Sequence, residues 1–370
     1  MSVSGTVRNV RVSGIACAVP ETVVLNEAFV PRFGAEQMQK FEKMVGVKER
    51  RASRPDQTAS DFACAAAMTL RERGLWMPEG VDAVLFVSQT PDYALPATAC
   101  VLQHRLGISK SCIAFDVNLG CSGFVYGFFI ASSMLQMSGV NKVLFLGGDC
   151  STKPVSPTDP SSAPLFGDSG FACLLERSDS APAVDYSYRT DGAGFKAIIQ
   201  PGVTYAGRMP IARERDRRLA DRLLTEDAEQ HRAPSEVLMD GMDVFNFTIN
   251  EVPDLIKEQM SRSGVSADQV DLMVLHQANR FVLKQVAMMT GFSMKKVPIS
   301  MDRYGNTSVT SIPLTLCDYA TANPGAGVKK VMMSGFGVGL SWGTLLTDFD
   351  FSVCQGISEG CAPFVEGVLA

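Results

Sequence analysis

The sequence predicts an α/β protein made of two duplicated halves, and three observations support this fold class. Short apolar segments of strand length alternate with longer segments of helical period along the chain. Two apolar segments of the first half, at 80–90 and 141–148, resemble two of the second half, at 269–279 and 329–336. The matching segments are almost equally spaced in both halves, which indicates a duplicated αβ unit packed about a pseudo-twofold axis.

The alternation assigns the individual elements. Seven apolar runs are predicted to be buried strands: residues 81–87, 112–117, 142–146, 170–176, 270–275, 330–334 and 344–349. Four segments have the period of amphipathic helices: residues 59–73, 123–137, 243–263 and 280–290. Because helices separate many of the strands, parallel pairing through crossover connections is expected.

The domain organisation follows from the same pattern. The two halves are assigned to residues 1–180 and 181–350, with the boundary in a link at 177–190 that contains Ser, Asp and Pro. Residues 202–234 are rich in Arg, Asp and Glu and are predicted to form a surface insertion. Residues 351–370 form a C-terminal tail to which the sequence assigns no role.

Composition excludes several classes of function. The 370 residues carry a net charge of −5, which argues against general nucleic-acid binding. No apolar stretch reaches the roughly 20 residues of a membrane span, and the N-terminus lacks the apolar core of a signal peptide. The ten cysteines form no C-x-x-C pair and only three histidines exist, so a metal site is not expected. Scattered thiols favour a reducing compartment, the cytoplasm.

The first candidate catalytic residue is Cys121, in the segment Asp-Val-Asn-Leu-Gly-Cys-Ser-Gly-Phe at 116–124. A predicted strand ends there, small residues make a turn, and a helix begins. The partial positive charge of a helix N-terminus favours a thiolate. The alternative is a buried structural cysteine.

His276 and Asn306 are the next candidates. His276 directly follows a predicted strand, so its ring is expected at the carboxyl edge of a sheet, where ligands bind in open α/β folds. His104 and His231 are predicted to lie on the surface. Asn306 lies in a turn rich in Gly, Asn, Thr and Ser, where a turn asparagine or helix cap is the alternative.

A fourth segment, Ser-Gly-Phe-Gly-Val-Gly-Leu-Ser-Trp-Gly at 334–343, lies between two predicted strands. Such a glycine-dense loop can direct a backbone N–H toward a developing oxyanion. It lacks the full dinucleotide-binding pattern and no helix follows it, so a Rossmann site is not expected.

These four segments, together with Gly-Val-Lys-Glu-Arg-Arg at 46–51 and Leu-Phe-Gly-Asp-Ser-Gly at 165–170, resemble the β-ketoacyl-acyl-carrier-protein synthase III family of the thiolase superfamily. The resemblance extends over residues 10–350. It implies a thiolase-like, five-layered αβαβα fold, a homodimer, an acyl carrier protein as partner, and no metal or redox cofactor.

The resemblance also implies roles for individual residues. Cys121 would take an acyl group from acyl-CoA or an acyl carrier protein. His276 and Asn306 would hold the carbonyl of a malonyl-type thioester such as malonyl-ACP, and stabilise the enolate that forms as CO₂ leaves. The backbone N–H groups of Cys121 and Val338 would form a second oxyanion hole, and Phe336 would border the reacting centre.

The sequence departs from the family at three places. Residues 39–45 lack the tryptophan that stacks on the adenine of coenzyme A, and Pro160 replaces an arginine that helps to hold the nucleotide. These changes favour a carrier-bound donor or a differently held CoA. Leu95 replaces a pocket phenylalanine, which favours acyl chains longer than acetyl.

The helix after His276 carries two basic residues, Arg280 and Lys284. They are predicted to dock the acidic carrier protein, with a solvated basic face as the alternative.

Alternative functions use the same residues. The acceptor could be a hydroxyl, an amine or a specialised-metabolite intermediate, which would make the chain an acyltransferase or a ketosynthase of polyketide or secondary metabolism rather than of fatty acid synthesis. A catalytically silent partner subunit would have lost the nucleophile, whereas Cys121 is present. A thiolase would need a second cysteine in the glycine loop, and residues 334–343 contain none.

Overall fold

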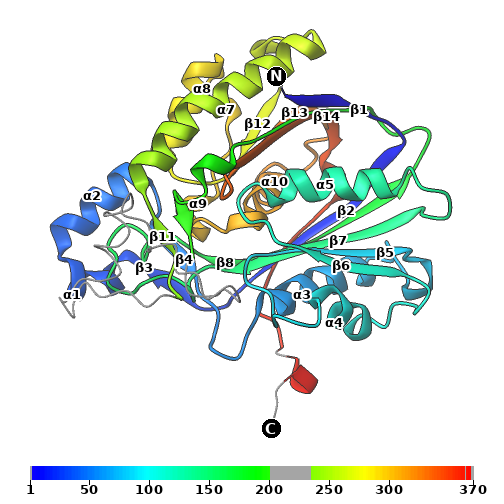
Figure 1. The fold of residues 1–370 in the computed structure, drawn as a ribbon, viewed down its shortest axis with the longest axis horizontal. Coiled ribbons are helices and arrows are strands. Elements are labelled where there is room, and N and C mark those ends of the chain that lie inside the picture. Colours follow the sequence, from blue (N-terminus) through cyan, green and yellow to red (C-terminus); the bar gives the residue numbers. More distant parts are fainter. Residues whose placement is uncertain (1, 201–234, 363, 368–370) are drawn as a thin grey trace.

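The computed structural model describes residues 2–200, 235–362 and 364–367. Two large sheets lie face to face with helices between and outside them (Figure 1). The first sheet has the order β15-β2-β8-β7-β5-β6 and the second has the order β1-β9-β14-β13-β12. The predicted insertion at 202–234, which includes His231, lies outside the described residues.

The bounds of the elements complete this description. The strands are β1 Val3–Val7, β2 Val10–Val19, β3 Val23–Leu25, β4 Glu49–Arg51, β5 Ala83–Val87, β6 Ile113–Val117, β7 Lys142–Cys150, β8 Asp168–Arg177, β9 Val184–Thr190, β10 Ile198–Ile199, β11 Leu238–Met239, β12 Leu272–Leu275, β13 Val328–Gly337, β14 Ser341–Asp350 and β15 Cys354–Glu359. The α-helices are α1 Val30–Phe33, α2 Ala35–Val45, α3 Ala59–Glu72, α4 Thr98–Arg105, α5 Gly123–Met134, α7 Gly241–Ser263, α8 Arg280–Thr290, α9 Met301–Tyr304 and α10 Ser311–Ala322.

Five layers result from this arrangement. Helices α3 and α4 cover the outer face of the first sheet, and α7, with α8 packed against it, covers the outer face of the second. Helices α5 and α10 lie between the two sheets and contact both (Figure 1). The expected αβαβα order is therefore confirmed. Three buried apolar clusters fill the interior: one between the first sheet and its outer helices, one between the two sheets, and one between the second sheet and its outer helices. Both sheets are therefore apolar on both faces, as their continuous apolar runs indicated.

The predicted duplication is visible in the strand pairing. In the first sheet, β5 is parallel to β7 and β7 is antiparallel to β8. In the second, β12 is parallel to β13 and β13 is antiparallel to β14. The two pairs of similar sequence segments thus contain strands at equivalent positions of the two sheets.

Each terminal strand belongs to the sheet of the opposite half of the chain. β1 pairs antiparallel with β9 at the edge of the second sheet. β15, from the C-terminal tail, pairs parallel with β2 at the edge of the first sheet. Most of β15 is only half-buried and shows no apolar alternation, so the sequence pattern did not identify it as a strand.

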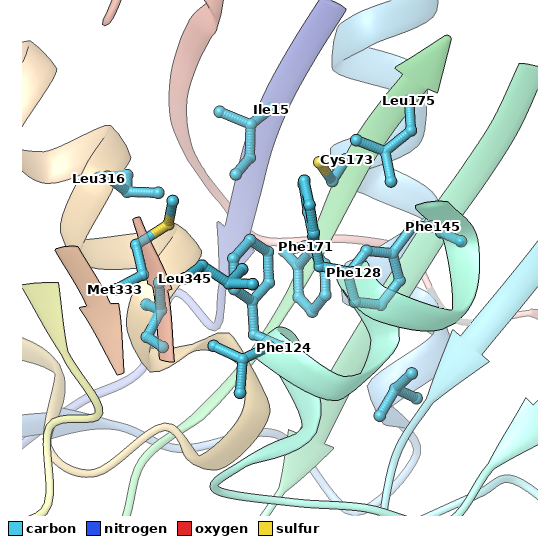
Figure 2. Close-up of a cluster of buried hydrophobic side chains, with 14 of the residues drawn as sticks. Ile15, Phe124, Phe128, Phe145, Phe171, Cys173, Leu175, Leu316, Met333 and Leu345 are labelled. Atoms are coloured by element: carbon cyan, nitrogen blue, oxygen red, sulfur yellow. The ribbon is translucent and has the colours of Figure 1, made fainter. Parts of the chain in front are cut away.

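The central layer is built around aromatic side chains of α5 and the first sheet. Phe124 of α5 contacts Phe145 of β7 and Phe171 of β8, with ring centroids 5.6 Å apart in both pairs. Figure 2 shows these rings together with Met333 and Leu345 of the second sheet. This packing fixes the N-terminal end of α5, and therefore the turn that precedes it.

Candidate active site

One cavity of about 510 Å³ brings together the candidate residues that lay far apart in the sequence. It is lined by Cys121, His276, Asn306, Phe336 and Val338, and further by polar side chains and an apolar wall. The polar residues include Gln89, Thr90, Asn118, Asp149, Ser151 and Ser308, and the apolar wall includes Val155, Leu165, Phe166, Ile198, Val244 and Phe245. Both halves of the chain contribute to it.

Cys121 lies in the turn between β6 and α5. Gly337 packs directly on it, since a Cβ placed on Gly337 would lie 2.5 Å from the Cβ of Cys121. This close approach requires glycine, and it brings the following N–H, that of Val338, to the thiol as a hydrogen-bond donor. The glycine loop therefore packs against the nucleophile through Gly337.

The ionisation of Cys121 differs from the expectation. Burial, followed by the nearby charge of Asp149, raises the pKa of the thiol to about 12, although hydrogen bonds from Ser308 and Val338 oppose the shift. The expected preference for a thiolate is therefore wrong for the resting enzyme. Helix α5 begins only at Gly123, two residues after Cys121, and burial has the largest effect on the pKa of the thiol.

His276 follows β12 without a break, and its backbone N–H donates to the carbonyl oxygen of Ser334 on β13 at 2.8 Å. Its Nδ1 lies 2.8 Å from the Oγ of Ser311, the first residue of α10. The ring of Phe336 meets the imidazole edge-on with centroids 5.5 Å apart. Burial lowers the pKa of His276 to about 3, so the ring is neutral at physiological pH.

Asn306 is held through its main chain and its side chain. Its N–H donates to the carbonyl oxygen of Leu165 at 2.9 Å, and its own carbonyl oxygen accepts from Gly167 at 3.0 Å. Its Oδ1 accepts from the N–H of Ser308 at 3.0 Å. With Oδ1 occupied in this way, the Nδ2 amide is the part of the side chain that remains for a ligand.

The remaining predicted site residues fall into two groups. Phe336 and Val338 line the cavity. Leu95 does not: it lies in the connection between β5 and α4, its side chain is 79% exposed, and it is not among the lining residues of this chain. Within the single chain it is therefore not part of the wall of this cavity. Arg280 and Lys284 are exposed on α8.

Three polar residues of the site were not identified from the sequence. Asp149 lies near the end of an apolar strand, Ser308 lies two residues after Asn306, and Ser311 begins α10. Asp149 could have been found, because an acidic residue at the end of a buried strand has to be compensated by partners. The two serines could not be identified in this way, because the turn contains several Ser and Thr residues and the sequence does not show which of their hydroxyls face the site.

Metal-binding clusters and membrane-spanning helices are not found among the described residues. No group of three or more His, Cys, Asp or Glu side chains in that part of the chain is arranged to hold a metal ion. No helix there is both long and apolar enough to cross a membrane.

Comparison with known proteins identifies the family. Residues 115–192 match the family model of 3-oxoacyl-[acyl-carrier-protein] synthase III, and residues 260–349 match the model of its C-terminal part. The β-ketoacyl-[acyl-carrier-protein] synthase III of Rhodopirellula baltica is 32% identical, over 92% of this chain and 99% of the relative.

Solved structures agree with this match. A 3-oxoacyl-(acyl-carrier protein) synthase from Burkholderia xenovorans superposes with a TM-score of 0.90 at 34% identity, covering 97% of this chain and 99% of the other. The priming β-ketosynthase of the R1128 polyketide pathway shares the fold, with a TM-score of 0.78 at 24% identity over 93% of this chain and 97% of the other. The chain therefore belongs to the 3-oxoacyl-[acyl-carrier-protein] synthase III family of condensing enzymes with a thiolase-type fold.

Proposed function

We propose that the chain catalyses a decarboxylative Claisen condensation, in which an acyl group on Cys121 is extended by a malonyl-type thioester such as malonyl-ACP. The observation that carries this proposal is the convergence of a thiol, a neutral imidazole and a side-chain amide in one cavity. In this assignment, residues 1–180 supply the nucleophile and residues 181–350 supply the two donors.

The first half-reaction is acyl transfer to the sulfur. The Cys121 sulfur attacks the carbonyl carbon of the donor thioester, and the donor thiol leaves. The negative charge on the tetrahedral oxygen is stabilised by backbone N–H groups, for which Cys121 and Val338 are the candidates. The contact of the Val338 N–H with the thiol supports this role, because it places a donor beside the reacting sulfur.

The second half-reaction needs hydrogen-bond donors for an enolate. When the malonyl-type thioester loses CO₂, negative charge develops on the thioester carbonyl oxygen. In the tautomer in which Nδ1 accepts from the Ser311 hydroxyl, neutral His276 carries its proton on Nε2 and can donate it to this oxygen, and Asn306 can donate from Nδ2. The enolate carbon then attacks the acyl carbonyl on Cys121, and the thiol is released. The thioesters and CO₂ loss supply the driving force, so no metal or redox cofactor is assigned.

The partners are proposed on the same basis. The exposed Arg280 and Lys284 form a basic face on the helix that follows His276, which suits an acidic acyl carrier protein. A homodimer in the cytoplasm is the proposed state. The cysteines support the compartment, because all ten are free thiols.

Intact-mass measurement tests the proposal. The protein is incubated with a panel of acyl-CoA and acyl-carrier-protein donors, with Cys121→Ala as control, and then with malonyl-ACP. An adduct that the variant lacks, followed by CO₂ release and a β-ketoacyl product, is the expected result. An adduct that is passed to a hydroxyl or amine without CO₂ release would replace the condensation by simple acyl transfer. No adduct from any donor would refute covalent catalysis.

A further inference from the structure

A closed network of hydrogen bonds lies behind the cavity, on the side of the two proposed enolate donors. The buried network consists of five side chains that are each 2% exposed or less: His276, Gln277, Ser300, Ser311 and Thr315. Apart from His276, none of them is among the described residues that line the cavity. They are therefore not placed to contact a substrate, and any effect they have on the reaction has to act through His276 or Asn306.

Gln277 provides the first connection of the buried network. Its Nε2 donates to the carbonyl oxygen of Leu275, the last residue of β12, at 2.9 Å. Its Oε1 accepts from the N–H groups of Ser300 and Met301 at 3.1 and 3.4 Å. The side chain that follows His276 in the sequence thus holds the start of α9.

Asn306 follows this anchored turn. Helix α9 ends at Gly305, whose N–H donates to the carbonyl oxygen of Met301 at 2.9 Å, and Asn306 is the next residue. The contact between Gln277 and the start of α9 therefore lies one helical turn before Asn306 in the chain.

A second connection closes the buried network through α10. The Ser311 Oγ lies 2.8 Å from the Nδ1 of His276. The Thr315 hydroxyl donates to the carbonyl oxygen of Ser311 at 2.7 Å, and its oxygen lies 2.7 Å from the Ser300 Oγ. Because the only hydroxyl proton of Thr315 goes to this carbonyl, the Ser300 hydroxyl is the donor in the last contact.

These contacts hold the segment 300–311, which has Asn306 near its middle, at both of its ends. No side-chain atom of the buried network is among the buried polar atoms that lack a partner in the described part of the chain. The hydroxyl oxygens of Thr307 and Thr310, in the same segment, are among them. A buried polar network whose members are all paired restricts their motion, so this network is suited to fix the position of the segment.

We infer that Gln277, Ser300 and Thr315 are positioning residues that fix the spacing of the enolate donors on His276 and Asn306; the inference rests on the proposed function. Stabilisation of the enolate needs both N–H groups directed at one oxygen, each about 3 Å from it. A displacement of about 1 Å in such a site can lower the rate about 100-fold. The buried network supplies the rigidity that this geometry requires.

The inference separates the two half-reactions. Acylation uses the sulfur of Cys121 and the main-chain donors of Cys121 and Val338, which form no hydrogen bond with the buried network in the described residues. Loss of CO₂ and attack on the acyl group need His276 and Asn306. Weakening the network should therefore slow condensation and leave acylation almost unchanged, a difference that a general loss of structure would not produce.

Ser300→Ala is the mildest test, because it deletes one oxygen and keeps the N–H that donates to Gln277. Condensation should slow by about 30-fold, whereas acylation should stay within about twofold of the wild type. The matched control is Ser187→Ala. The Ser187 side chain is 0% exposed and donates to the buried Gln259 at 2.6 Å, and neither residue lines the cavity. Both half-reactions of this control should match the wild type.

Thr315→Val removes a second hydroxyl of the buried network and keeps the shape of the side chain. It should show the same difference between the half-reactions, and Thr315→Ser, which retains a hydroxyl, should restore condensation to within about threefold. Thr290→Val is the matched control, because the buried Thr290 hydroxyl also donates to a carbonyl one helical turn back, at 2.7 Å. In Ser300→Ala/Thr315→Val the second substitution should add little, since both remove the same contact.

The half-reactions are measured separately. Acetyl-CoA, octanoyl-CoA and the corresponding carrier-protein thioesters are tested as donors, and adduct formation on Cys121 is followed by intact mass. Loaded enzyme that has been freed of donor is then mixed with malonyl-ACP, and CO₂ release and loss of the adduct are timed over a single turnover. Crystal structures of the wild type, Ser300→Ala and Ser187→Ala give the distance between the His276 Nε2 and the Asn306 Nδ2 without any substrate.

The outcomes are distinct. Slower condensation with normal acylation in Ser300→Ala, normal rates in both controls, and a shift of about 0.5 Å or a second conformer at His276 or Asn306 support the inference. An equal loss of both half-reactions, or unchanged condensation, overturns it. If the wild type takes no acyl group from any donor, the proposed function fails, and the crystal structures still decide the inference: an unchanged distance with single conformers in Ser300→Ala refutes the positioning role.

Discussion

Part of the destabilisation of the fold by acid is expected to come from His276. Burial lowers the pKa of this imidazole from 6.5 to about 3. As the pH falls below 6.5, the unfolded chain takes up a proton at this position, whereas the folded chain takes one up only near pH 3. The unfolded state therefore binds more protons throughout this interval, and the free energy of unfolding decreases as the pH decreases.

The size of the effect follows from these two values. Between pH 7.5 and pH 5, protonation of the unfolded state at this one site removes about 2 kcal/mol from the free energy of unfolding. His276→Gln keeps a polar side chain without a titrating ring, so this contribution disappears. Urea denaturation gives the free energy of unfolding of the wild type and of His276→Gln at both pH values. The contribution of His276 is the loss between pH 7.5 and pH 5 in the wild type minus the same loss in the variant.

Two features make the comparison decisive. Other buried acids, such as Asp149 and Asp168, are present in both proteins, so their contributions cancel. His104→Gln, which removes an exposed imidazole from α4, is the matched control for replacing a histidine. An equal loss of stability on acidification in the wild type and in His276→Gln would show that the ring is not held neutral, and it would undermine its assignment as an N–H donor to the enolate.

Three further predictions test other parts of the structure. Gly337→Ala should abolish acylation, because the new Cβ would lie 2.5 Å from that of Cys121; a normal adduct by intact mass would contradict this packing. Arg50→Met should lower the free energy of unfolding by about 3 kcal/mol, because three oxygens lose their buried charged donor; an unchanged urea midpoint would argue otherwise. Arg280→Glu should raise KM for carrier-bound substrate about tenfold, with Arg73→Glu, just after α3, as control; equal KM values would remove the docking assignment.

The sequence predicted the parts of the fold that depend on local pattern. Long apolar runs placed five inner strands, β5, β7, β8, β13 and β14, within a few residues, because strands buried on both faces are apolar without interruption. The inner strands β2 and β9 were not predicted, and β9 lies within the segment that was expected to be a link. The duplication was also predictable, since equivalent strands such as those at 83–87 and 272–275 face similar layers and retain similar side chains. β15 was missed, because an edge strand is held by main-chain hydrogen bonds that leave little trace in its side chains.

The sequence predicted which residues form the site better than it predicted their ionisation and exposure. Cys121, His276 and Asn306 follow strands or turns at the edge of the sheets, and that placement can be recognised in the sequence. The raised pKa of Cys121 depends first on burial and then on Asp149, which is 28 positions away and is brought near the sulfur by the pairing of β7 with β5. Exposure of Leu95 likewise depends on the course of a loop that composition does not determine.

The pairing of β1 with β9 and of β15 with β2 has a consequence for folding during synthesis. β1 is synthesised well before its neighbour β9, and β2, which pairs with β8 on one side, is synthesised well before its other neighbour β15. The outer edge of β2 therefore stays unpaired until residues 354–359 have been made, and an unpaired edge can pair with other chains. A shortened polypeptide that ends before residue 354 would make that edge permanent. Residues 354–359 thus cover the edge of β2 in the newly made protein, and truncations that remove them carry a risk of aggregation that an activity assay would not reveal.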